Sequence, residues 1–188
     1  MRVFIAVELP ESVKRSIYNL QKRMVDNINR IKWVSPDSLH ITLKFLGEVE
    51  ERRLKDISEV ADKVASKFSS FFIKMEEVGI FPERGVPRVI WVGISEGSFE
   101  LSSIAKQIDE GLFEKGFPRE RKKWVPHITL GRVKRLQNPE IIKKFTKENI
   151  KGEKTKVEAI TLMQSNLTPQ GAIYKSLERF FLKGEKIG

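Results

Sequence analysis

The stretch KWVSPDSLHITL at residues 32–43 recurs in shortened form as KWVPHITL at residues 123–130. Each copy opens with Lys-Trp-Val, continues through a proline and ends in the tetrad His-Ile-Thr-Leu. The two tetrads contain both histidines of the chain, His40 and His127. Two copies of one module, each with one histidine, predict a duplicated fold in which the two halves build one active site.

Composition favours a folded protein with an anionic partner. Of the 188 residues, 40% are hydrophobic, which is enough for a sizeable core. The 35 Lys plus Arg against 25 Asp plus Glu give a net charge of +10. Seven basic residues and one acid, Glu120, lie within residues 119–135, around the second tetrad. This clustering favours nucleic acid as the partner.

Other features of the sequence limit the compartment and the chemistry. The chain has no cysteine, which excludes disulfides, cysteine metal sites and cysteine nucleophiles. The apolar run at its amino terminus is too short for a signal peptide, and no stretch of about 18 consecutive apolar residues occurs. We therefore expect a cytoplasmic protein that does not contact a membrane.

Hydrophobic periodicity predicts the order of the secondary-structure elements. Strands are expected over residues 3–7, 39–46, 71–80, 89–94, 127–133 and 157–163, with a further strand over 172–181 after a turn at 169–171. Helices are expected over 11–31, 54–68, 101–112 and 141–145. Each half is then strand, helix, strand, helix, strand, an α+β arrangement. Residues 81–87, with two prolines and a glycine, are the expected crossover between the halves.

The tetrads place two kinds of polar group on one face of each strand. Residues i and i+2 of a strand point to the same side, so His40 projects with Thr42, and His127 with Thr129. If the halves are related by an approximate two-fold axis, the two strands flank one cleft. A single histidine before a β-branched strand is more often structural. The repetition, which uses every histidine of the chain, favours catalysis.

Such a cleft suits an in-line displacement at phosphorus. One imidazole would remove a proton from the attacking oxygen, the other would protonate the leaving oxygen, and the two threonine hydroxyls would donate to the non-bridging oxygens. Histidine fits both roles because its ordinary pKa, roughly 6.5, allows one neutral and one protonated ring near neutral pH. This chemistry requires neither a metal nor a cofactor.

The motifs resemble those of the two-histidine phosphoesterase superfamily. The resemblance rests on the paired His-x-Thr-x tetrads, the opening MRVFIAVELPE at residues 1–11 and the segment PHITLGR at residues 126–132. Within the superfamily, the chain resembles the RNA 2′,3′-cyclic phosphodiesterases, also called 2′-5′ RNA ligases, along essentially its whole length.

The resemblance implies a fold, an activity and site residues. The fold would be one bilobal α+β domain over residues 1–188, with two pseudo-symmetric lobes at about 1–82 and 83–188 that can exchange terminal strands. Each lobe would have an antiparallel sheet with helices on its outer face, and the active-site cleft would lie between them. The activity would be metal-independent opening of RNA 2′,3′-cyclic phosphate ends to 2′-phosphates, with tRNA fragments among the candidate substrates and a monomeric enzyme. His40 would donate a proton to the departing 3′ oxygen, and His127 would accept one from water.

The remaining candidate residues depend on geometry. Thr42, Thr129 and Arg132 are candidate substrate ligands, although Arg132 has the opposite strand parity from Thr129 and reaches the phosphate only if the strand bends or ends at Gly131. We expect Trp33 and Trp124 to belong to the core, with stacking on a base as the alternative. Tyr174 and Phe45 carry no pattern that assigns them a role.

Several other functions lack their motifs. The sequence has no phosphate-binding Gly-x-x-x-x-Gly-Lys-Ser/Thr, no Gly-x-Gly-x-x-Gly and no His-Glu-x-x-His. The segment KFLG at residues 44–47 lacks the aspartate of a nucleotidyl-lysine ligase motif. Two alternatives stay open. One is nucleotide-independent 2′-5′ RNA ligation by the same histidines, and the other is a non-catalytic protein that binds RNA ends.

Overall fold

Strands from distant parts of the chain meet in one curled antiparallel sheet. The computed structural model describes residues 1–150, 152 and 154–184. In this part of the chain the sheet has nine strands in the order β7-β4-β5-β6-β3-β1-β8-β9, and β2 also pairs with β6. The strands are β1 (Arg2–Glu8), β2 (Arg30–Trp33), β3 (His40–Glu48), β4 (Phe71–Phe81), β5 (Val89–Glu96), β6 (His127–Arg135), β7 (Thr155–Val157), β8 (Ala159–Thr168) and β9 (Gly171–Phe181).

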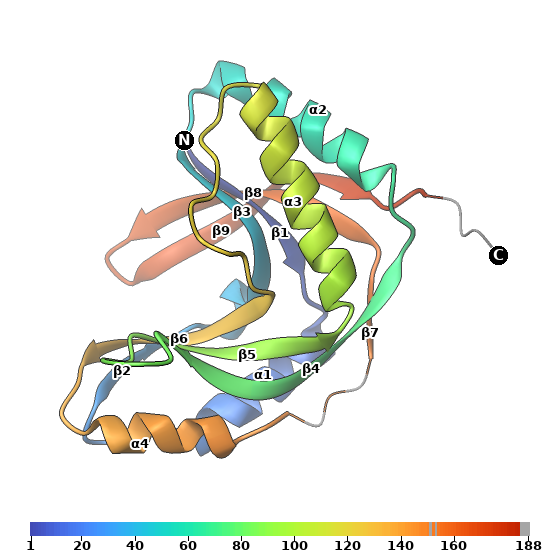
Figure 1. Cartoon of the computed structure of the whole chain (residues 1–188). Coiled ribbons are helices and arrows are strands. Elements are labelled where there is room, and N and C mark those ends of the chain that lie inside the picture. Colours follow the sequence, from blue (N-terminus) through green and yellow to red (C-terminus); the bar gives the residue numbers. More distant parts are fainter. Residues whose placement is uncertain (151, 153, 185–188) are drawn as a thin grey trace.

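The sheet consists of two halves that join where β3 meets β6. Among the described residues, the register of this pair holds one match, Ile41 with Ile128, the second residues of the two tetrads. Equivalent residues that face each other across an antiparallel pair lie beside a local two-fold axis. Figure 1 shows β1, β3, β8 and β9 in the upper half and β2, β4, β5 and β6 in the lower half. The expected α+β fold with two antiparallel halves is confirmed.

Neither half of the sheet is a continuous stretch of chain. In one half β1 pairs with β3 and β8, and β8 pairs with β9. In the other half β4 pairs with β5 and β7, and β6 pairs with β5 and β2. Each half of the sheet therefore combines strands from the amino-terminal and the carboxy-terminal parts of the chain. Residues 81–87 are not a crossover between halves, because β4 and β5 pair directly up to Phe81 and Val89. These residues instead form the turn of a β-hairpin between β4 and β5. A segment rich in proline and glycine is typical of a hairpin turn as well as of a crossover.

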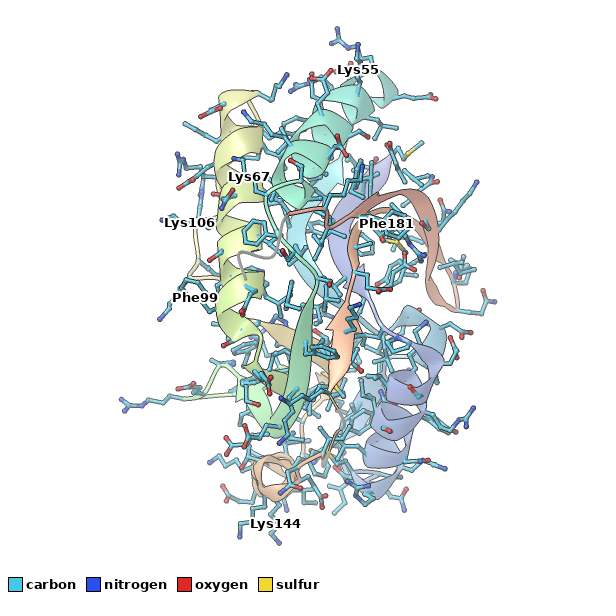
Figure 2. All side chains as sticks on the ribbon, turned by 90° about the vertical axis from the view of Figure 1, so that its right-hand side faces the viewer. Lys55, Lys67, Phe99, Lys106, Lys144 and Phe181 are labelled. Atoms are coloured by element: carbon cyan, nitrogen blue, oxygen red, sulfur yellow. The ribbon has the colours of Figure 1, made fainter. Side chains whose placement is uncertain are left out.

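Four α-helices cover the described sheet: α1 (Glu11–Arg23), α2 (Leu54–Ala65), α3 (Ser98–Glu114) and α4 (Pro139–Lys144). α2 and α3 pack together beside the upper half, and α4 lies below the lower half (Figure 1). Lys55 of α2 and Lys106 of α3 lie at the surface seen in Figure 2, with Lys67 just after α2 and the exposed Phe99 of α3. Gly111 of α3 allows close packing, because a Cβ there would lie 2.8 Å from a methyl group of Val60 on α2. Within the described part of the chain, no helix has the length and apolar character to cross a membrane.

The first helix ends earlier than its periodicity predicts. α1 stops at Arg23 instead of continuing to about residue 31, and residues 30–33 form β2. Asp26 turns the chain, since its carboxylate accepts hydrogen bonds from the backbone N–H groups of Ile28 at 2.6 Å and Asn29 at 3.1 Å. β2 then pairs with β6, a contact between distant segments that local periodicity does not encode. The periodicity also does not predict β7, because this strand forms by pairing with the distant strand β4.

A buried glutamine ties the segment before His40 to the second tetrad. Gln21 of α1 donates from Nε2 to the carbonyl oxygens of Val34 and Leu130, both at 2.9 Å. The backbone N–H of Val34 also donates to the carbonyl of Leu130 at 2.8 Å. The approach to the first histidine is therefore anchored on β6, the strand of the second histidine.

The segment before His127 is in turn anchored on β3, the strand of the first histidine. Lys44 on β3 has a side chain that is 5% exposed, and its ammonium lies 2.6 Å from Oδ1 of Asp109 on α3. The same ammonium donates to the carbonyl of Pro118 at 3.0 Å, and Trp124 donates from Nε1 to the carbonyl of Thr42 at 3.1 Å. The segment before each histidine is thus held by contacts with the strand that carries the other histidine.

The buried Lys44–Asp109 pair generates a stability prediction. Asp109→Asn leaves the Lys44 ammonium buried without its carboxylate, which we expect to lower the free energy of unfolding by roughly 2–4 kcal/mol, because an unpaired buried charge keeps its desolvation cost. Urea unfolding monitored by tryptophan fluorescence measures the loss. The double variant Lys44→Met/Asp109→Leu should recover most of it.

An exposed ion pair on the same helix is the matched control. The ammonium of Lys106 lies 4.0 Å from Glu110, with side chains 76% and 46% exposed, so Lys106→Met should change the free energy of unfolding by less than about 1 kcal/mol. An Asp109→Asn variant as stable as this control would show that the buried pair does not hold the segment before His127.

Candidate active site

A β-bulge follows each tetrad at the same position of its strand. In β3 the register with β1 skips Leu43, and in β6 the register with β5 skips Leu130. A bulge adds one residue and so reverses the alternation of the side chains beyond it. Phe45 and Arg132, each five positions after its histidine, consequently face the same side as the histidines. The bulge supplies the bend that Arg132 needs.

The predicted site residues meet in one cavity of about 350 Å³ between the two halves of the sheet. It is lined by all five of them: His40, Thr42, His127, Thr129 and Arg132. Its other lining residues are Arg2, Phe4, Val34, Ser38, Phe45, Ser165, Leu167, Ala172 and Tyr174.

Both imidazoles are oriented by a backbone carbonyl two residues upstream. Nδ1 of His40 lies 2.7 Å from the carbonyl oxygen of Ser38, and Nδ1 of His127 lies 2.7 Å from that of Val125. Because a carbonyl only accepts, Nδ1 of each ring must carry a proton and donate it. The neutral rings therefore keep the lone pair on Nε2. In His40 this nitrogen lies 2.8 Å from the Thr42 hydroxyl, which donates to it when the ring is neutral.

Burial lowers the pKa of both histidines below the ordinary value. For His40, burial is the main cause, the bond to the Ser38 carbonyl opposes it, and the charges of His127, Lys14 and Arg132 lower the pKa further. For His127, burial again dominates, the Val125 carbonyl opposes it, and Arg132 adds a lowering charge. Without an anion in the cavity, both rings therefore favour the neutral form. A bound phosphodiester would raise both pKa values, because its charge stabilises imidazolium.

Aromatic rings pack against each histidine. The ring centroids of Phe4 and Tyr174 lie 4.9 and 5.2 Å from that of His40. Phe81 and Trp91 pack near His127 at 5.3 and 6.2 Å. These contacts fix the planes of the imidazoles and contribute to the burial that lowers their pKa values.

Several cavity residues were not predicted from the sequence. Arg2 and Phe4 lie on β1 and Tyr174 on β9, strands that only the folded sheet brings beside β3. For Phe45, alignment of the two repeats could have predicted a place in the cavity, because Phe45 occupies the position equivalent to Arg132. The expectation for the tryptophans is confirmed, since Trp33 and Trp124 pack against the core and neither lines the described cavity.

Comparison with known proteins shows relatives over the whole length of the chain. A family model described as LigT like phosphoesterase matches residues 7–91 and again 92–174. A protein of Archaeoglobus fulgidus named RNA 2′,3′-cyclic phosphodiesterase is 42% identical over 183 residues, covering 96% of this chain and 99% of the relative. A protein of the same name from Methanocaldococcus jannaschii is 38% identical over 186 residues, covering 96% and 100%.

Solved structures share the fold. A crystal structure from Thermus thermophilus superimposes with a TM-score of 0.84 at 33% identity, covering 99% of this chain and 100% of the other. The apo crystal structure of E. coli LigT superimposes with a TM-score of 0.79 at 24% identity, covering 96% of each chain. The repeated match of the family model agrees with the duplication read from the two tetrads.

The charge of Arg132 on His127 leads to a prediction about proton affinity. Arg132→Gln removes a positive charge that disfavours imidazolium, so the pKa of His127 should rise while burial continues to hold it down. NMR titration of the imidazole protons can measure this directly, because the chain has two histidines. Lys134→Gln is the matched control, with the same loss of charge on the same strand outside the cavity lining. Equal shifts in the two variants would contradict a specific effect of Arg132.

Proposed function

The chain belongs to the family of LigT-like phosphoesterases, and from this premise we infer that it is an RNA 2′,3′-cyclic phosphodiesterase, which hydrolyses the cyclic phosphate at an RNA end. Relatives that match it end to end carry that name. One observation supports the inference most directly: the histidine and threonine of both tetrads, related by the local axis at Ile41 and Ile128, line a single cavity. Two histidines on opposite sides of one site suit the proton transfers of an in-line displacement.

In the proposed reaction, a water molecule attacks phosphorus opposite the bond to the 3′ oxygen. Nε2 of His127 takes a proton from the water as the new P–O bond forms. Nε2 of His40, protonated, gives its proton to the 3′ oxygen as the old P–O bond breaks. The products are a 2′-phosphomonoester and a 3′-hydroxyl group. Because their Nδ1 atoms donate to backbone carbonyls, both rings are already in the tautomer that these transfers need.

The other cavity groups would stabilise the charge on phosphorus. We assign the hydroxyls of Thr42 and Thr129, with the guanidinium of Arg132, to the non-bridging oxygens, where negative charge increases in the transition state. Binding of the phosphate would turn the Thr42 hydroxyl away from Nε2 of His40, 2.8 Å distant, and toward the substrate. No step requires a metal or a cofactor.

The division of roles follows the positions of the two histidines in the family motif. Arg132 lowers the pKa of both rings, so its charge does not by itself distinguish the proton acceptor from the donor. We assign His127 as the acceptor, and His40, beside the aromatic pair Phe4 and Tyr174, would take up its proton once the anionic substrate is bound.

The substrate and the setting follow from the same site. We propose RNA with 2′,3′-cyclic phosphate termini, tRNA fragments included, as the substrate, and the cytoplasm as the compartment in which such RNA is met. We also propose that the enzyme works as a monomer, because one chain supplies both tetrads of the cavity.

The first test is product assignment with an RNA that ends in a 2′,3′-cyclic phosphate, in the presence of EDTA. We expect turnover to a 2′-phosphate, and dependence on a divalent ion or a 3′-phosphate product would contradict the mechanism. His40→Ala and His127→Ala should each abolish most turnover. The double variant should lose little more than either single one, because the two rings serve one step.

Further variants and substrates complete this test. Thr42→Ala and Thr129→Ala should lose less, up to roughly 10² to 10³ in rate, since each removes a neutral hydrogen bond.

Addition of an RNA with a 5′-hydroxyl end tests ligation, in which the histidines exchange roles. Salt-dependent binding without turnover, unaffected by loss of both histidines, would instead identify a non-catalytic RNA-end-binding protein.

The lowered pKa values predict the pH dependence. One ring must be neutral and the other protonated, so kcat/KM should follow a bell whose maximum lies below about pH 6.5, the ordinary value for histidine. The kcat profile should lie at higher pH, because the bound anion raises both pKa values. Residual activity should lose its acidic limb in His127→Ala and its basic limb in His40→Ala. The opposite pattern would show that the two roles are reversed.

A further inference from the structure

A second arginine lines the cavity without a partner for its charge. Arg2 lies on β1, with its guanidinium carbon 5.0 Å from the ring centroid of Phe45. Within the described residues it makes no side-chain hydrogen bond and no ion pair, and its buried Nε has no acceptor. The carboxylate opposite it in the β1–β3 register, Glu48, is 77% exposed and does not pair with it.

An arginine held in this way is suited to bind an anion. A buried N–H group without an acceptor carries a desolvation cost, which a ligand oxygen would remove. Stacking on Phe45 restrains the plane of the guanidinium, so its fork of donors is oriented before a ligand arrives. A phosphate matches this fork in both charge and geometry.

The position of Arg2 relates it to the histidines. Arg2 and Phe4 point to the same face of β1 and lie two residues apart, about 6.6 Å along a strand. Phe4 packs directly on the ring of His40. In the β1–β3 register His40 lies opposite Glu8, so Arg2 lies beyond Phe4 as seen from His40, and Arg2, Phe4 and His40 line the same cavity.

The two repeats differ in the charge that follows each tetrad. Arg132 follows the second tetrad, and its equivalent after the first tetrad is Phe45, a ring without charge. Arg2 comes from a different strand and places a positive charge above that ring. The cavity therefore has one arginine near His127 and another on the side of the first tetrad.

We propose that Arg2 binds the phosphodiester on the 5′ side of the terminal nucleotide, so that the enzyme favours RNA ends over cyclic mononucleotides. The inference rests on the proposed function, which places the cyclic phosphate between His40 and His127. The terminal nucleoside then lies between the histidines and Arg2, along the wall that contains Phe4 and Phe45. RNA enters the cavity from the β1–β3 side.

The test uses three substrates that differ by one charge or one nucleotide: adenosine 2′,3′-cyclic phosphate, adenylyl-adenosine with the same terminus, and that dinucleotide with a neutral methylphosphonate linkage. The readout is the ratio of kcat/KM for the charged dinucleotide to that for the methylphosphonate. In the wild type we expect a ratio of about 10 to 100, the range for a hydrogen-bonded charge contact. In Arg2→Gln the ratio should fall to about 1.

Two further variants separate phosphate binding from a purely structural role. Arg2→Lys keeps the charge without the fork, so it should retain an intermediate ratio. It also provides an informative variant if the glutamine substitution prevents folding. Arg52→Gln removes an arginine that is 79% exposed and paired with Glu50, and it should leave the ratio at the wild-type value. The salt dependence of kcat/KM on the charged dinucleotide should be weaker in Arg2→Gln than in the wild type, because one screened charge contact is lost.

Two results would overturn the assignment. A wild-type ratio near 1 would show that no group of the enzyme reads the charge of that linkage. An Arg2→Gln variant that loses activity equally on all three substrates, with its ratio unchanged, would show that Arg2 acts on the cyclic phosphate or on the fold. Failure of the wild type to open any of the three cyclic phosphates would overturn the proposed function itself.

Discussion

The contact between Ile41 and Ile128 is the constraint on which the site depends. These equivalent residues of the two repeats face each other where β3 meets β6, and the two halves of the sheet diverge on either side of them. Both isoleucines are completely buried, so hydrophobic packing holds the joint while the neighbouring histidines and threonines face the cavity. A symmetric joint in the core thus places a symmetric pair of histidines and threonines along the cavity.

The interleaved path of the chain makes this joint rigid. The segment before His40 is bound to the strand of the second tetrad through Gln21, and the segment before His127 is bound to the strand of the first through Lys44. The two halves therefore cannot separate without breaking buried hydrogen bonds, which are costly to leave unmade. The in-line displacement proposed for this site would need this precision, because both proton transfers would depend on fixed distances across one phosphate.

The proposed reaction would need two unlike histidines, and the structure breaks the symmetry of the two repeats at the end of the tetrads. After equivalent bulges, one strand presents Arg132 and the other presents Phe45. Arg132 lowers the pKa of both histidines, and aromatic side chains pack against each ring. The duplication supplies a matched pair of imidazoles, and the residues around them differ. The role proposed for Arg2, whose guanidinium carbon lies 5.0 Å from the ring centroid of Phe45, would extend this asymmetry to the direction of the substrate.

The sequence by itself determined the repeat, the histidine and threonine pairs, the α+β class and the family, because each rests on local spacing or on residues that stand in recognisable order. It did not determine how the strands are shared between the halves, since strand pairing depends on contacts between distant segments. β2 reads as the end of a helix and becomes a strand only because the edge of β6 accepts it. Arg132 has the wrong parity for the site until the bulge at Leu130 reverses the alternation, and a bulge is a property of two paired strands. Nothing in the sequence assigns Arg2 or Tyr174 to the cavity, although Arg2 belongs to the opening segment that resembles the family. They enter the cavity because β1 and β9 lie in the same half of the sheet as the first tetrad, and only the tertiary structure brings these strands together.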